Sequence, residues 1–203
     1  MIPRLRARRR RGYTIVELLM ALTVLAIGVS GIIAMQKVTV SANRHARSLA
    51  LATNIAQAWI DQLNADAVLW NYPSPQPGSA GSDIGETRWL NQIATNDGWF
   101  QPAAVGDQFG PAFDALGNVV PAAADPSQVV FCTHLRLTWL QPDTAGSGLI
   151  RAEVRVFWLR DGGGGAVADG GLCNDDAVDQ IGAAVTNYHF VYQTTAIKQN
   201  TAS

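Results

Sequence analysis

The chain has 203 residues, enough for one modest domain plus an anchor, or at most two small domains. Its formal net charge of −1 conceals an asymmetry, because six of the fifteen basic residues lie among the first eleven positions. Without residues 1–12, nine basic residues face sixteen acidic ones, a net charge of −7. This net negative charge excludes a general affinity for nucleic acid, whose backbone requires a cationic surface. Only a localised basic patch could bind DNA.

An apolar segment follows the arginines. From position 13 to position 36 the only charged residue is Glu17. The run is long enough to cross a bilayer as a helix, which takes about 20 residues. The basic stretch before it predicts a cytoplasmic N-terminus. A carboxylate in such a segment costs about 2.5–3.5 kcal/mol at mid-membrane, so we expect Glu17 to have a partner.

A glycine followed by an apolar segment with a glutamate five residues on is the signature of a type IV prepilin, and positions 24–36 resemble minor pilins of the PilV type. The resemblance implies that a prepilin peptidase cleaves between Gly12 and Tyr13 and that Tyr13 is then N-methylated. Glu17 becomes the fifth residue, which in this family is thought to pair with the N-terminal amine of a neighbouring subunit. Many major pilins have a proline where Ala34 stands, and that proline is linked to melting of the helix in the filament.

The resemblance also implies an α+β pilin fold, with a long N-terminal helix packed on a small antiparallel sheet. It implies a structural subunit rather than an enzyme, with the prepilin peptidase, other minor pilins, the major pilin and a tip adhesin as partners. Before assembly the chain would sit in the inner membrane with a periplasmic C-terminal domain. After assembly it would lie in the pilus filament at the cell surface.

Periodicity predicts the long helix independently. No proline lies between positions 5 and 72, so one helix from about residue 14 to about residue 65 is permitted. Its part 13–36 is apolar all round, with only Gly28 and Gly31 to loosen it, and its part 37–66 is amphipathic. The apolar positions recur at intervals of three and four: Leu49, Ala52, Ala56, Trp59, Ile60 and Leu63. The polar positions fall largely on the other side: Asn43, Arg44, Arg47, Asn54, Gln57 and Asp61.

Residues 67–128 read as a connecting region, because seven of the nine prolines lie there and exclude long regular elements. One short helix is predicted, capped by Asp83 or Thr87, with Trp89, Leu90 and Ile93 pointing inward. Four further aromatic residues are interpreted as members of a small core rather than a ligand platform: Trp99, Phe100, Phe109 and Phe113.

From position 129 to the end of the chain the period changes to two, which predicts an antiparallel β-sheet region, 129–203. Apolar residues alternate with polar ones over 131–139 and again over 150–158, with turn residues between the two runs. These runs predict a hairpin with one apolar and one polar face. The alternation of Tyr188, Phe190, Tyr192 and Thr194 predicts a last strand.

The two cysteines, Cys132 and Cys173, follow the apolar segment and would be exported, where disulfides form. A bridge between them is the favoured interpretation, with two buried thiols or a link to another chain as alternatives. The acidic, glycine-rich stretch 161–179 could supply oxygen ligands to calcium, but its spacing departs from the EF-hand pattern, and a solvated loop is favoured.

No catalytic motif and no metal site is predicted. The three histidines, His45, His134 and His189, are scattered and are interpreted as polar surface or strand residues. The sequence lacks a nucleophile elbow, a phosphate-binding glycine loop and a zinc-binding His-Glu-x-x-His.

Alternatives to the pilus subunit remain. A type II secretion pseudopilin shares the N-terminal motif, although positions 26–36 and the strand pair 129–160 favour the pilus. An exported enzyme or binding protein with an ordinary signal peptide would be cut after Val40-Ser-Ala42 and would begin at Asn43. An unprocessed single-span protein would keep Met1 or Ile2.

Overall fold

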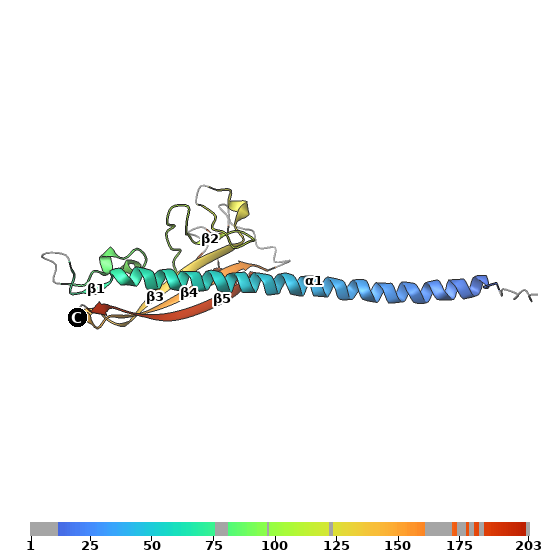
Figure 1. Ribbon diagram of the computed structural model, residues 1–203, viewed down its shortest axis with the longest axis horizontal. Helices are drawn as coiled ribbons and strands as arrows, with labels where there is room; N and C mark the ends of the chain where they lie inside the picture. Colours follow the sequence, from blue (N-terminus) through green and yellow to red (C-terminus); the bar gives the residue numbers. More distant parts are fainter. Residues whose placement is uncertain are drawn as a thin grey trace, which may run out of the picture. The chain divides into compact units, whose positions relative to one another are not determined.

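The computed structural model describes residues 12–75, 81–96, 98–121, 124–160, 172–173, 178, 181–182 and 185–201. The chain divides into two compact units between Ala46 and Arg47. Helix α1 contributes residues to both units (Figure 1).

Helix α1 runs from Ile15 to Asp66, close to the predicted bounds, and passes through Gly28 and Gly31 without a break. In the first unit every described residue is exposed. A window of eighteen residues has a mean hydropathy of 2.4, so this helix is long and apolar enough to cross a membrane. The continuity follows from the composition, because the helix contains no proline and glycine costs only about 1 kcal/mol in a helix interior.

In the second unit the last turns of α1 pack against one face of a β-sheet. The buried helix residues that join the main core are Ala52, Ile55, Ala56, Trp59 and Leu63. Four of the six predicted apolar positions are therefore confirmed, and Ile60 packs partly against the core. The prediction for Leu49 is wrong: this side chain is 43% exposed, because the core begins one turn later at Ala52.

The sheet has four antiparallel strands in the order β2-β3-β4-β5. They are β2 (Ala112–Phe113), β3 (Phe131–Gln141), β4 (Leu149–Leu159) and β5 (Tyr188–Lys198). In the central pairing Leu135 lies opposite Val154, and Val154 lies opposite Gln193. The predicted α+β class, with one long helix and a small antiparallel sheet, is confirmed, and the arrangement is consistent with the pilin fold.

The prediction of a polar face on the β3–β4 hairpin is wrong over half its length. Cys132 and His134 are fully buried, although both point away from the helix side of the sheet. A second apolar cluster covers Cys132 and its neighbour Phe157 with Leu172, Ile181 and Tyr188. Alternation along β3 alone does not show this cover, because it comes from residues that lie after the hairpin.

Short 3-10 helices replace the single short helix that was predicted in the connecting region. Two of them are η2 (Ile84–Glu86) and η3 (Leu90–Ala94). Asp83 precedes η2 and Thr87 follows it, and neither residue caps η3. As predicted, Trp89 and Leu90 are buried. The remaining 3-10 helices are η1 (Ala67–Leu69), η4 (Pro126–Gln128), η5 (Thr144–Gly146) and η6 (Val185–Asn187).

A buried carboxylate joins the end of α1 to the connecting region. Both oxygens of Asp66 accept hydrogen bonds from backbone amides: Oδ1 from Arg88 at 2.7 Å, and Oδ2 from Trp89 at 2.9 Å and Leu90 at 3.1 Å. Asp66 is only 7% exposed. Hydrogen bonds to an ionised acceptor are roughly twice as strong as neutral ones, so this carboxylate fixes where the connecting region begins to pack.

The end of α1 is also held by a segment far along the chain. Strands β1 (Asn71–Tyr72) and β6 (Asn200–Thr201) form a parallel pair. The Asn200 side chain donates to the carbonyl oxygens of Ala67 at 3.1 Å and Val68 at 3.2 Å. These carbonyls belong to the turn after the helix, where they also accept hydrogen bonds from the backbone N–H of Trp70 and the side chain of Asn71.

Candidate processing and assembly site

The start of α1 presents the predicted processing site in an open, non-helical segment. Gly12, Tyr13 and Thr14 precede the first helical residue, and Tyr13 is 85% exposed. The Thr14 hydroxyl accepts a hydrogen bond from the backbone N–H of Glu17 at 3.3 Å. This is the N-cap arrangement that threonine favours, and it explains why the helix begins after Thr14. The Gly12–Tyr13 peptide bond therefore lies outside the helix.

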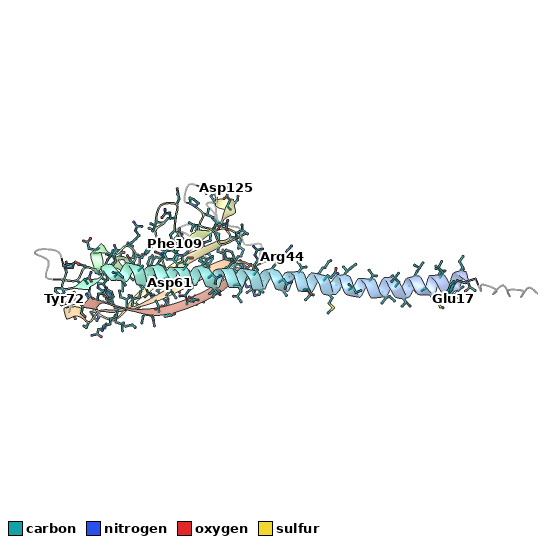
Figure 2. All side chains as sticks on the ribbon, viewed as in Figure 1. Glu17, Arg44, Asp61, Tyr72, Phe109 and Asp125 are labelled. Atoms are coloured by element: carbon teal, nitrogen blue, oxygen red, sulfur yellow. A yellow bond between two sulfur atoms is a disulfide. The ribbon has the colours of Figure 1, made fainter. Side chains whose placement is uncertain are left out.

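Glu17 lies in the first turn of α1, where the partial positive charge of the helix dipole favours a carboxylate (Figure 2). Its side chain is exposed, and no salt bridge involves it among the described residues. It is the only charged residue between positions 13 and 36. The structure thus places an exposed carboxylate one turn after the predicted cleavage point, on a stretch of helix with no other charged residue up to position 36.

The comparison with protein families bears on this same stretch. Residues 7–33 match the family described as the prokaryotic N-terminal methylation motif. The match supports a type IV prepilin-like protein and, with it, the type IV pilin or pseudopilin families. It covers the end of the arginine run, Gly12, Tyr13, Glu17 and most of the apolar segment. No match was found among the curated proteins or among the solved structures.

The methylation motif and the apolar helix fit membrane anchoring and pilus assembly. The motif implies processing by a prepilin peptidase and assembly with other pilins, and it points to a structural subunit. Within the described residues, no group of three or more metal-ligating side chains could hold an ion. Most of the stretch 161–179, where calcium was considered, lies outside the described residues.

The structure contains a disulfide between Cys132 and Cys173, with their Cα atoms 5.4 Å apart. Cys132 is in β3, and the bridge fastens the segment after β4 onto the sheet face that points away from α1. The bridge spans 41 positions and lies within the second apolar cluster. It therefore maintains the cover that buries this part of the sheet.

Beyond that cluster the same face carries arginines and aromatic rings that the sequence did not group together. The guanidinium carbons of Arg136 and Arg155 lie 4.9 and 4.4 Å from the ring centroid of Trp99. Trp99 therefore serves this cluster and not the small core to which it was assigned, whereas Phe100 and Phe113 are buried in the main core as predicted. The Trp99 ring also makes an edge contact with Tyr192, with their centroids 5.9 Å apart.

Two histidines lie on strands, and one of them is buried rather than exposed. An Arg155 guanidinium nitrogen lies 2.7 Å from Nδ1 of His134. A guanidinium can only donate hydrogen bonds, so Nδ1 of His134 accepts this one and the imidazole is neutral. Burial, followed by the charge of Arg155, lowers the pKa of His134 to about 3. His134 therefore stays neutral at physiological pH and acts as a structural acceptor for Arg155.

Proposed function

We propose that the chain is a minor pilin: a non-catalytic subunit that a prepilin peptidase processes and that enters a type IV pilus, at its tip or in the complex that primes assembly. The observation that carries this proposal is the methylation motif over 7–33 combined with the isolated Glu17 on an exposed apolar helix. Resemblance of positions 24–36 to PilV-type minor pilins supports the pilus assignment.

In this proposal, hydrolysis of the Gly12–Tyr13 bond removes the arginine-rich leader and frees the α-amine of Tyr13, which then receives a methyl group. The new cation lies next to the positive end of the helix dipole, an unfavourable position. The Glu17 carboxylate of an incoming subunit neutralises the amine of the subunit before it. Pairing the two charges in a low dielectric avoids the cost of leaving either one alone.

The first test is the intact mass and N-terminal peptide map of the protein from its native membrane. A chain that begins with N-methyl-Tyr13 supports the proposal, and a chain that begins at Asn43 refutes it. The structure offers an argument against the Asn43 start, because positions 40–43 lie in the interior of α1. Signal-peptide cleavage would have to open the helix there.

The role of Glu17 is tested by Glu17→Ala. We expect processing to stay largely intact while the fraction of subunit recovered in sheared filaments falls several-fold, because a buried amine is left without its counter-ion. Asp61→Ala is the matched control, since Asp61 is an exposed carboxylate on the same helix. Normal incorporation of the Glu17 variant would refute the charge pair.

The second candidate function is a minor pseudopilin of a type II secretion system, which the same N-terminal motif supports. Deletion of the gene distinguishes the two. A minor pilin is required for surface filaments but not for release of secreted enzymes, whereas a pseudopilin gives the opposite result.

A further inference from the structure

Basic residues are concentrated on one surface of an otherwise acidic unit. Residues 47–203 contain seven Lys or Arg and fifteen Asp or Glu. The strand register places four of the seven on the side of β3, β4 and β5 that points away from α1, against one acidic residue, Glu153. We call this surface the outer sheet face; its basic members are Arg136, Arg151, Arg155 and Lys198.

The single carboxylate on this face is shared. Glu153 accepts hydrogen bonds from Arg136 at 2.7 and 2.8 Å, and it lies 3.5 Å from the Nε atom of Arg151. Arg155 has no salt bridge among the described residues. The outer sheet face therefore carries an excess of about three positive charges.

Part of this face is open to a partner. Tyr192 is 57% exposed, and the side chain of Arg151 is 43% exposed. The half-buried Trp99 lies beside Tyr192 and is held by the guanidinium groups of Arg136 and Arg155. Tryptophan, tyrosine and arginine are the residues that contribute most to protein–protein interfaces, because rigid aromatic rings and planar cations lose little conformational entropy on binding.

The complementary charge is found on the same chain. The connecting region 67–128 holds six acidic residues and one basic residue, Arg88. Glu86, Asp107 and Asp125 are exposed. Hydrogen bonds from Ser127 lower the pKa of Asp125, so its carboxylate is ionised at neutral pH. In Figure 1 most of the connecting region, green to yellow, lies on the opposite side of the second half of α1 from β5, red, while Trp99 of this region packs on the outer sheet face.

We propose that the outer sheet face docks the acidic connecting region of a second copy of the chain. The contact is head-to-tail, because each copy supplies a different surface, and such contacts repeat into open chains or close into rings. A protein partner fits better than a nucleic acid. The net charge of −8 on residues 47–203 repels a polyanion at long range, whereas the exposed carboxylates of the connecting region act on the basic face at contact, within a Debye length of about 8 Å.

This contact goes beyond the proposed function and uses none of the N-terminal motif. It is tested on the full chain in detergent by sedimentation velocity, with the micelle mass subtracted. We expect concentration-dependent self-association that dissociates near 1 M salt, where the Debye length is about 3 Å. The variant Arg151→Glu/Lys198→Glu should raise the apparent dissociation constant about tenfold or more, because like charges then face each other.

Two further variants make the test specific. Arg88→Glu is the matched control: it reverses an exposed arginine of the acidic surface itself and should not weaken association. A quadruple variant that adds Glu86→Lys and Asp107→Lys to the double variant makes the outer sheet face acidic and the connecting region basic. This exchange should restore association. Circular dichroism spectra that match the unmodified chain confirm that each variant is folded.

Three results would overturn the proposal. The first is a monomer at all concentrations. The second is association that neither salt nor the double variant changes, which would assign it to the apolar half of α1. The third is salt-sensitive binding of a fluorescent single-stranded oligonucleotide that the double variant abolishes, which would make this face a nucleic-acid surface. None of these outcomes concerns cleavage at Gly12, so failure here leaves the pilin assignment standing.

Discussion

The carboxylate of Asp66 provides a sharp test of how the helix and the connecting region are joined. In Asp66→Ala the backbone amides of Arg88, Trp89 and Leu90 lose their acceptor, and the bonds from Trp89 and Leu90 are buried. A buried donor left without a partner costs about 1–3 kcal/mol. Two such donors and one partly exposed donor therefore predict a loss of about 3–5 kcal/mol, a large share of the 5–15 kcal/mol that is typical of a folded domain.

The assay is urea unfolding of the full chain in detergent, followed by tryptophan fluorescence. Asp61→Ala is the control, because Asp61 is exposed on the same helix and its one side-chain hydrogen bond is with Gln57. We expect this control to change the free energy of unfolding by less than about 0.5 kcal/mol. A loss below about 1 kcal/mol for Asp66→Ala, at an unchanged m-value, would show that the three hydrogen bonds do not hold the connecting region.

Three further predictions concern the second unit. Cys173→Ala should lower the free energy of unfolding by about 4 kcal/mol under oxidising conditions, because it opens a loop of 41 positions; an equal loss in reducing buffer would contradict this. Gly148→Ala should cost about 1–3 kcal/mol by urea unfolding, because its Cβ would collide with the Trp70 ring, and a neutral result would show that the ring moves aside. The hydrogen bond from Arg136 lowers the pKa of Glu153 from 4.5, so the contribution of this pair is present above pH 4.5 and is lost as the pH falls through the lowered pKa. The stability difference between the unmodified chain and Glu153→Gln should therefore shrink in acid, and a pH-independent difference would refute the pairing.

Elements with a repeating pattern could be predicted from the sequence. The absence of proline and the spacing from Ala52 to Leu63 are local signals, and they give the length and the inward face of α1. The alternation over 131–139 and 150–158 likewise gives the long strands. The prepilin-type site could be located because Gly12 and Glu17 lie five positions apart on one short segment.

The rest depends on contacts between distant segments. Strands β1, β2 and β6 have two residues each, too few to show a period. The amides that Asp66 binds lie 22 to 24 positions away, in a region without periodicity. His134 looks like an outward polar residue by alternation, but in the structure it is buried and contacts Phe157 and Arg155 of the neighbouring strand. The sequence alone could not group Trp99 with Arg155, because that requires the register of β3, β4 and β5.

The hydrogen bonds from Asn200 to the turn after α1 have a consequence for the export that the proposed function requires. They join residues up to 133 positions apart, so they cannot form until residue 200 has reached the same side of the membrane as residue 67. Until then the parallel pair of β1 with β6 is absent. Contacts of such long sequence separation form slowly, because loop-closure entropy is lost first. In the proposed function, where the second unit is exported, this unit completes its fold only after residue 200 has crossed the membrane. Insertion of the apolar helix then precedes completion of the folded surface.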